Sequence, residues 1–406
     1  QGKAAGVGNT EAQRADVVRR PDRLARRVQS PRKPGVLGCH AGRAGVGVAL
    51  GRECFDADFA MIRQMGANAL RSLSGPHVPY LYDRCDKEGM LAWVDLPFTS
   101  SLTSFGDIYY YPTAAFHVNG IEQAKEIIYQ NFNHPSIVMW GLFSLISGRG
   151  DDAIPFINEL NDLVHQIDPS RKSVACSNRD GDINFITDLI VLRQNVGWTK
   201  GSYDDVRVWC EQLRDNKKFS KLRYGVCYGE EGDVKHNADE LHRMEVGARY
   251  LPERNQTEMH ERYATLINEN PVFWGVWLDN MFDHSSRHHN EGMRRSGVVG
   301  FDHTTKKDAY YLYRALWNGG EPTLYIAERN WQRRSDNLQR IKVYSSVGCP
   351  HLVVGGDTIA MRETSPRIWC ADSVMLSDSQ LVRVVDASGR CRDSVMLTID
   401  KLRVRR

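Results

Sequence analysis

GANALRSLSGPHVPYLYDRCDKEGMLAWVDLPF (Gly66–Phe98) is the stretch that decides the fold. It contains two short apolar runs, Ala69–Ser72 and Leu91–Leu96, with the amphipathic segment Tyr80–Glu88 between them. A short apolar run, a helical pattern and a second apolar run are typical of a βαβ unit with parallel strands. The stretch therefore predicts an α/β protein.

The same alternation extends outward from about Gly35 to Asn318. In the segment Ile154–Ile167, for example, apolar residues recur every three and four positions, which predicts a helix with one buried face. Eight strand and helix pairs over about 280 residues fit a (β/α)8 barrel, and a doubly wound sheet is the alternative. The eight predicted strands are Val36–His40, Ala69–Ser72, Leu91–Leu96, Ile137–Phe143, Ser173–Ser177, Leu189–Arg193, Arg223–Tyr228 and Val272–Leu278.

The pattern changes after Gly319, where short β-rich runs are separated by turn-forming residues. We expect a small all-β sandwich over residues 319–406, following a barrel over residues 35–318. The predicted strands are Thr323–Ala327, Arg340–Tyr344, His351–Val354, Leu381–Val385 and Asp393–Ile399.

Composition limits the class of protein. The 406 residues are 41% hydrophobic and 25% charged, with a net charge of +3, which is the balance of a globular protein without a polyanionic partner. Residues 1–34 are basic and lack apolar periodicity, so we expect a disordered leader rather than a nucleic-acid-binding tail. No signal-peptide or membrane-spanning pattern is evident, which gives a cytoplasmic location by default. The nine cysteines form no CxxC pair and predict neither a zinc site nor a disulfide framework.

Several motifs carry a resemblance to a known family. Besides Gly66–Phe98, the stretches NFNHPSIVMWGLFSLISGRG (Asn131–Gly150), YGVCYGEEGDVKHN (Tyr224–Asn237) and FDHTTKKDAYYLYRALWN (Phe301–Asn318) resemble barrel sequences of glycoside hydrolase family 2, the β-galactosidase and β-glucuronidase family. The resemblance implies a (β/α)8 TIM barrel followed by an immunoglobulin-like sandwich. It also implies retaining hydrolysis of a terminal β-linked sugar without a cofactor.

Retaining hydrolysis uses two carboxyl groups about 5 Å apart, one as acid/base and one as nucleophile. The resemblance places the acid/base after the fourth strand, where this chain has Ser144 and Leu145 in place of Asn-Glu. It places the nucleophile after the seventh strand, where the simplest alignment deletes a Glu between Cys227 and Tyr228. A third family position, a Trp near the eighth strand, is Asp279.

Weak replacements for the missing carboxylates are available. Glu230 and Glu231 lie beside the deleted nucleophile, although solvated loop charges are the simpler interpretation of both. Asp151 and Asp152 follow the fourth strand, but we expect them to cap the next helix. Cys227 is interpreted as a small buried side chain rather than a reactive thiol.

Other site residues follow from the resemblance. The positions that survive and are expected to bind substrate are His40, Trp198, Trp277, Asn280 and Asp283. The histidines His284, His288 and His289 are interpreted as loop residues, because no carboxylate partner is fixed by their spacing; no metal site is therefore expected.

The sequence thus predicts a family 2, β-galactosidase-like protein that acts on carbohydrate but has little or no hydrolytic activity. The alternative is a non-catalytic carbohydrate-binding or scaffold protein, and a third possibility is a decayed gene product without a selected function. The expected partner is a β-galactoside-like carbohydrate, with no nucleic acid and no membrane, and the oligomeric state is left open.

Overall fold

The computed structural model describes residues 35–39, 42–47, 49–98, 101–102, 108–198, 200–215, 224–245, 247–286 and 289–400. The leader predicted over residues 1–34 and the substrate-binding residue predicted at His40 lie outside the described residues. No helix in the described ranges is both long enough and apolar enough to span a membrane.

Eight parallel strands are hydrogen-bonded in the order of a closed barrel, β1-β11-β10-β9-β8-β6-β3-β2, which confirms the predicted barrel. Each strand begins and ends within one residue of its prediction wherever both ends are described. The strands are β1 (Gly35–Cys39), β2 (Ala69–Ser72), β3 (Leu91–Asp95), β6 (Ile137–Ser144), β8 (Lys172–Ser177), β9 (Leu189–Arg193), β10 (Tyr224–Tyr228) and β11 (Phe273–Leu278).

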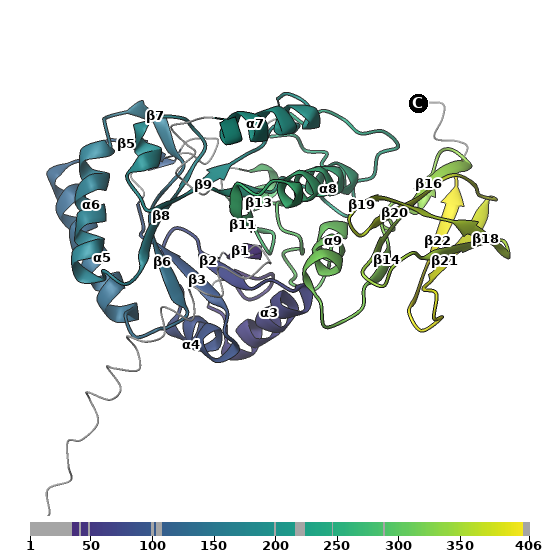
Figure 1. Cartoon of the computed structure of the whole chain (residues 1–406), viewed down its shortest axis with the longest axis horizontal. Helices are drawn as coiled ribbons and strands as arrows, with labels where there is room; N and C mark the ends of the chain where they lie inside the picture. Colours follow the sequence, from purple (N-terminus) through teal and green to yellow (C-terminus); the bar gives the residue numbers. More distant parts are fainter. Residues whose placement is uncertain are drawn as a thin grey trace, which may run out of the picture. The chain divides into compact units, whose positions relative to one another are not determined.

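Helices connect most of these strands (Figure 1). They are α3 (Arg52–Met65), α4 (Pro79–Glu88), α5 (Ala114–Asn131), α6 (Ile154–Ile167), α7 (Tyr203–Asp215), α8 (Glu253–Glu269) and α9 (Asp308–Trp317). Between β8 and β9 the described chain forms a short 3-10 helix, η1 (Asp182–Phe185), instead of an α-helix.

Local sequence explains where these helices stop. Helix α3 ends at Gly66, whose φ of 90° is in the left-handed region that favours glycine. A Cβ at Gly66 would lie 2.4 Å from the backbone nitrogen of Asn318, so only glycine fits this close approach. Helix α4 begins with Pro79 in its first turn, where the missing N–H costs nothing, and it ends at Gly89 in a left-handed conformation.

The described chain divides into two compact units. The first is Ala69–Leu192, which contains β2, β3, β6 and β8 and most of β9. It also holds a three-stranded sheet of β4 (Ser101–Leu102), β5 (Ile108–Tyr110) and β7 (Ile146–Gly150). The second unit comprises Gly35–Asn68 and the chain from Arg193 onward, including the C-terminal strands.

A buried ion pair lies among the strands of the first unit. The Nη2 atom of Arg71 in β2 is 2.9 Å from Oδ2 of Asp95 in β3, and both side chains are almost fully buried. The Arg71 guanidinium also lies 3.8 Å from the ring centroid of Trp93, a cation–π contact. The positive charge of Arg71 is therefore stabilised both by the carboxylate of Asp95 and by the ring of Trp93.

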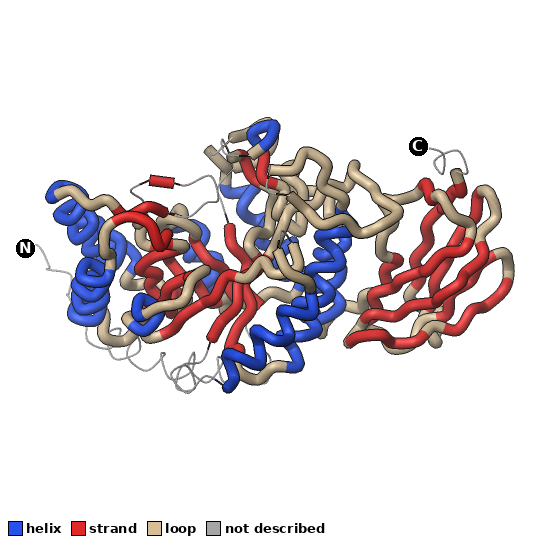
Figure 2. Tube along the Cα trace, turned by 90° about the horizontal axis from the view of Figure 1, so that it is seen from above, coloured by secondary structure: helices blue, strands red, loops and turns tan. Residues whose placement is uncertain are grey.

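The chain after α9 is a β-sandwich, as predicted, and Figure 2 draws this part as strands and loops. One sheet has the order β14-β16-β20-β19 and the other has the order β15-β22-β21-β17-β18. The strands are β14 (Leu324–Ile326), β15 (Arg333–Arg334), β16 (Leu338–Ser345), β17 (His351–Val354), β18 (Asp357–Ala360), β19 (Arg362–Ser365), β20 (Ile368–Met375), β21 (Ser379–Val385) and β22 (Arg392–Ile399).

Strand β20 lies in the middle of its sheet, yet the sequence pattern did not predict it. Its alternation of apolar and polar residues is interrupted by Asp372 and Ser373, and Ser373 has a φ of 58°. The register between β16 and β20 shifts at this point, which indicates a bulge. Period-two alternation is lost at a bulge, so the strand could not be recognised from the sequence.

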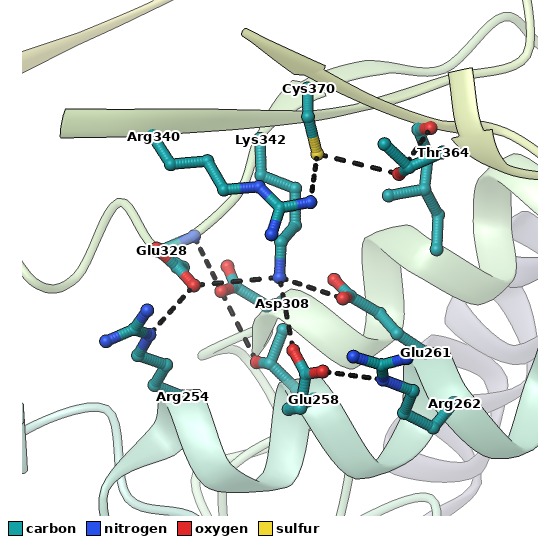
Figure 3. A network of polar contacts seen from close by, with 12 residues as sticks. Arg254, Glu258, Glu261, Arg262, Asp308, Glu328, Arg340, Lys342, Thr364 and Cys370 are labelled. Atoms are coloured by element: carbon teal, nitrogen blue, oxygen red, sulfur yellow. Dashed lines mark hydrogen bonds and ion pairs between the residues drawn. The ribbon is translucent and has the colours of Figure 1, made fainter. Parts of the chain in front are cut away.

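An ion-pair network joins helix α8 to the sandwich within the second unit (Figure 3). Nζ of Lys342 in β16 lies 2.8 Å from Oε2 of Glu261, 3.8 Å from Oε2 of Glu258 and 3.6 Å from Oε1 of Glu328. Burial disfavours the ammonium charge, but the three carboxylates outweigh burial and raise the pKa of Lys342 above its usual range. Lys342 is therefore charged in the folded protein and holds three acidic groups together.

We predict that Lys342→Ala destabilises the protein by about 3–5 kcal/mol, because removing one partner of a buried ion pair leaves uncompensated charge. Urea unfolding followed by circular dichroism measures the change. Lys235→Ala, the same substitution at an exposed lysine, is the control and should change stability by less than about 0.5 kcal/mol. A loss below about 1 kcal/mol for Lys342→Ala would show that water reaches these carboxylates.

Candidate active site

The end of strand β6 is where the acid/base was expected. Leu145 follows the strand with a φ of 52°, and its side chain is half-buried. Its backbone N–H donates to the carbonyl oxygen of Cys176 at 2.9 Å, and its carbonyl oxygen accepts from the N–H of Ile108 at 2.8 Å. The backbone of Leu145 is thus held in place, but the side chain offers no proton to a leaving group.

A residue with a left-handed backbone conformation also follows strand β2 in the first unit. Ser74, two residues after β2, has a φ of 61°, and its N–H donates to Oδ2 of Asp95 at 3.2 Å. Left-handed conformations of residues other than glycine cost about 1–3 kcal/mol and cluster at functional sites. The family resemblance puts a His-Tyr pair at Ser74 and Gly75, and it puts the acid/base at Leu145. The left-handed backbone is therefore present at two positions where the side chains expected from the family are missing.

The carboxylates of Asp151 and Asp152 are exposed. Oδ1 of Asp152 accepts from the N–H of Ile154 at 3.0 Å, at the first residue of helix α6. This contact satisfies one of the free N–H groups of the helix start. Asp152 thus contacts the helix start from the residue before the N-cap, Ala153, which makes no side-chain cap hydrogen bond itself. Capping by Asp151 stays a prediction.

The end of strand β10 in the second unit is where the nucleophile was expected. The hydroxyl of Tyr228 lies 2.7 Å from that of Tyr313 in α9, and its ring packs on Tyr263 and His260 of α8. Tyr228 therefore faces the helices. Successive side chains of a strand point to opposite faces, so the residue that faces away from the helices at this strand end is Cys227, which is buried.

Charged residues meet beyond the ends of three neighbouring strands, β9, β10 and β11. Nη2 of Arg193, the last residue of β9, lies 2.7 Å from Oδ2 of Asp279 and 3.8 Å from Oε1 of Glu230. Nη2 of Arg294 in β13 (Met293–Arg294) also lies 2.7 Å from Oδ2 of Asp279. We call Arg193, Glu230, Asp279 and Arg294 the strand-end cluster.

Glu230 is the carboxyl group of this cluster with the most altered acidity. Burial raises the pKa of Glu230 to about 7, although the guanidinium groups of Arg193 and Arg294 act in the opposite direction. A carboxyl group with a pKa near 7 is partly protonated at neutral pH, which suits a proton donor better than a nucleophile. Its neighbour Glu231 has a structural contact, because Oε1 of Glu231 accepts from the N–H of Arg295 at 2.9 Å.

Two of the predicted substrate-binding residues are buried tryptophans. Trp277 in β11 is 1% exposed, and its ring meets that of Trp274 edge to face at a centroid distance of 4.6 Å. Trp198 is 5% exposed. Core packing accounts for both positions, so a role of these rings in stacking on a sugar stays a prediction.

The two predicted polar residues are also buried, and each has partners. Nδ2 of Asn280 donates to Oγ of Ser296 at 2.7 Å. Oδ1 of Asp283 lies 2.8 Å from Nζ of Lys307 and accepts from the N–H of Gly297 at 2.8 Å. Burial raises the pKa of Asp283 to about 6, and Lys307 opposes that rise. These contacts account for Asp283 structurally, and its role toward substrate stays a prediction.

Arg193 and Arg294, which define the strand-end cluster, were not among the site residues predicted from the sequence. A signal for Arg193 was present, because a charged residue ends an otherwise apolar run, LIVLR, at the carboxyl end of a predicted strand. No comparable signal existed for Arg294, since it lies in a short hairpin strand paired with β12 (His284–Ser285).

The histidine loop does not form a metal-ligating group in the described ranges. His288 lies outside them, and Nδ1 of His289 is 2.7 Å from Oγ of Ser286. The one described group of three residues with suitable spacing is Asp83, Asp86 and His134. Both oxygens of Asp86 already have partners, Nδ1 of His134 and the N–H of Ser136, each at 2.8 Å.

Comparison with known proteins agrees with the barrel. The family model of glycosyl hydrolases family 2, TIM barrel domain, matches residues 35–319. The chain belongs to glycosyl hydrolase family 2. The resemblance stated from the barrel motifs is thereby confirmed.

Named family 2 proteins align with more than half of this chain. A β-glucuronidase of Bacteroides fragilis is 36% identical over 353 residues, which cover 85% of this chain and 50% of the relative. A β-galactosidase of Thermoanaerobacterium thermosulfurigenes is 23% identical over 55% of this chain and 29% of the relative. The crystal structure of an FMN-binding β-glucuronidase from Facaelibacterium prausnitzii L2-6 aligns with a TM-score of 0.81 and 25% identity over 91% of this chain and 56% of that structure. The chain thus spans about half the length of these relatives or less.

We predict that Glu230→Gln raises the free energy of unfolding, relative to the parent protein, more at pH 8 than at pH 5. The pKa of Glu230 is raised in the folded state, so between about pH 4.5 and pH 7 the folded protein binds more protons than the unfolded chain, and its stability falls as the pH rises. Glutamine cannot ionise and removes this loss, which amounts to about 2–3 kcal/mol.

Urea unfolding of both proteins at pH 5, 6, 7 and 8 measures this effect. Glu240→Gln, which removes the charge of an exposed glutamate, is the reference variant. If the free energy of unfolding differed between Glu230→Gln and the parent by the same amount at all four pH values, the raised pKa of Glu230 would be contradicted.

Proposed function

We propose that this chain is a carbohydrate-binding family 2 barrel whose hydrolytic activity is lower than that of its relatives by several orders of magnitude. The observation that supports this proposal is Leu145 at the end of β6, where the resemblance puts the acid/base. Loss of acid–base assistance alone lowers rates by about 10²–10⁴-fold. The buried thiol of Cys227 at the end of β10 supports a further loss in the nucleophilic step.

The proposed ligand is a terminal β-linked sugar. The relative that is 36% identical is named a β-glucuronidase, and more distant relatives are named β-galactosidases, so β-glucuronides and β-galactosides are the two classes to test. Binding without turnover is the role that remains when a barrel keeps its scaffold and lacks its acid and nucleophile.

A second candidate function is slow hydrolysis with Glu230 as the proton donor. It is favoured by the raised pKa of Glu230 and by its position two residues after β10. In the strand-end cluster Glu230 and Asp279 contact the same nitrogen of Arg193, so two carboxyl groups are close together at one place. This candidate predicts a residual rate that Glu230→Gln abolishes.

We predict that the purified chain binds an aryl β-glucuronide or an aryl β-galactoside but hydrolyses it at least about 10⁴-fold more slowly than the Bacteroides fragilis relative. Isothermal titration calorimetry measures binding, and release of p-nitrophenol measures turnover. Turnover at a rate comparable with that of the relative would refute the proposal, and so would absence of binding by a folded protein.

Restoring the missing groups tests the proposed cause of inactivity. The variant carries Ser144→Asn and Leu145→Glu together with a glutamate inserted before Tyr228, and a parallel variant replaces the insertion by Cys227→Glu. We expect at least one to gain activity, because Cys227 faces away from the helices that Tyr228 contacts. Leu145→Gln in the same background is the control and should remain inactive. Two folded but inactive variants would show that the missing carboxylates do not by themselves explain inactivity.

A further inference from the structure

Two loop segments of the second unit carry part of the strand-end cluster. The first segment, residues 230–233, follows β10 and begins with the glutamate of the cluster. The second segment, residues 294–297, begins at the end of β13 with one of its arginines. The N–H of Gly232 donates to the carbonyl oxygen of Arg295 at 2.9 Å, and Nε of Arg295 lies 2.7 Å from Oδ2 of Asp233. The two segments therefore lie side by side.

A buried glutamine bridges the two segments. Gln256 lies in the first turn of α8 and has no exposed surface. Its Nε2 donates to the carbonyl oxygen of Glu230 at 2.6 Å and to that of Gly297 at 3.3 Å. Its Oε1 has no hydrogen-bond partner among the residues that the structure describes. A buried acceptor without a partner is unfavourable, so the two donated bonds are the contacts that explain a glutamine at this position.

A buried lysine contacts the same two segments from a second helix. Lys307 is the N-cap residue of α9 and is 1% exposed. Its Nζ donates to the carbonyl oxygen of Gly232 at 2.6 Å, to that of Arg295 at 2.9 Å and to Oδ1 of Asp283 at 2.8 Å. An ammonium group has three N–H donors, so these contacts use all of them. Lys307 thus joins the two segments to each other and to Asp283.

Glycines allow the segments to approach these contacts closely. A Cβ added to Gly232 would lie 2.7 Å from Cβ of Gln256, and a Cβ added to Gly297 would lie 2.2 Å from the backbone nitrogen of Asp283. Both distances are too short for a side chain, so only glycine fits at either position. The segments are therefore packed directly against the residues that bind them.

Charged and titratable groups face Glu230 from several elements. Their effect on its carboxyl group depends on distance and on burial, so the position of the first segment decides both. The groups are Arg193 of β9, Arg294 of β13, Asp279, Glu231, Tyr203 of α7 and Tyr263 of α8.

We propose that Gln256 and Lys307, which we call the loop clamp, are positioning residues that keep Glu230 buried beside the arginines of the strand-end cluster. The inference rests on the second candidate function, in which Glu230 is the proton donor. The hydrogen bonds of the loop clamp to the segments end on main-chain oxygens, so it acts through backbone position and not through contact with a ligand. Misplacement of a reacting group by about 1 Å can lower a rate about 100-fold.

The variant Gln256→Met tests the loop clamp, because it removes both N–H donors at similar volume and without a change of charge. When the first segment loosens, water reaches Glu230, and we expect the pKa of Glu230 to fall from about 7 to below about 6, toward its usual value of 4.5. Carbon-13 NMR of the whole chain, labelled at the carboxyl carbon of glutamate side chains, measures this titration. The spectrum of Glu230→Gln identifies the resonance.

Gln339→Met is the matched control. Gln339 is a buried glutamine of β16 whose Nε2 also donates to a main-chain oxygen, that of Asp336, at 2.6 Å. We expect this control to lower stability and to leave the pKa of Glu230 unchanged. An unchanged or raised pKa of Glu230 in Gln256→Met would overturn the proposal, and so would an equal fall in Gln339→Met.

The lysine is tested by Lys307→Met together with Asp283→Asn, which removes a buried ion pair without a net change of charge. Its control is Lys342→Met together with Glu261→Gln, which removes a second buried pair in the same way. We expect the first pair of substitutions, and not the second, to lower the pKa of Glu230. Equal effects of the two would show that general loss of stability, and not loop position, changes the pKa.

Hydrolysis of an aryl β-glycoside gives a second measurement. The residual rate assigned to Glu230 should fall about 10–100-fold in kcat in Gln256→Met, with a smaller change in KM, and should stay unchanged in Gln339→Met. Absence of residual hydrolysis by the parent would count against the second candidate function. The NMR titration needs no substrate and decides the role of the loop clamp by itself.

Discussion

Parallel strands bring their carboxyl ends to the same edge of a sheet, and the residues at those ends decide what chemistry a barrel can perform. In this chain the strand ends carry leucine after β6, a buried cysteine at the end of β10 and an aspartate after β11. Leu145 retains a left-handed backbone although its side chain has no titratable group. The position is maintained by main-chain hydrogen bonds, which do not depend on the identity of the side chain.

Ion pairs organise the strand-end cluster in the second unit. Oδ2 of Asp279 lies 2.7 Å from a guanidinium nitrogen of Arg193 and 2.7 Å from one of Arg294, so its charge is compensated by two ion pairs. Glu230 stands beside them with a raised pKa, because burial outweighs the attraction of Arg193 and Arg294. Ion pairing thus dominates these strand ends, and one carboxyl group keeps the acidity that a proton donor needs.

The same balance between burial and charge attaches the sandwich to helix α8. Lys342 is buried because three glutamates compensate it, and those glutamates are tolerated because Lys342 stands between them. Aromatic and aliphatic packing adds to this attachment, since Leu312 and Ala315 of α9 join a core cluster with Tyr344 and Ile368 of the sandwich.

The sequence pattern placed the strands and helices, because apolar runs of four to eight residues separated by helical patterns specify such elements locally. It left a doubly wound sheet open, and the closed strand order excludes that alternative. The family resemblance, followed along the chain, also put Leu145 and Cys227 near the expected catalytic positions, and this assignment stays a prediction. The tertiary structure alone decided that Arg193, Glu230, Asp279 and Arg294 meet, and that Lys342 reaches α8, because their separation in sequence carries no information on which side chains converge. Strand β20 was likewise decided by tertiary pairing, because a bulge removes the alternation that reveals a strand.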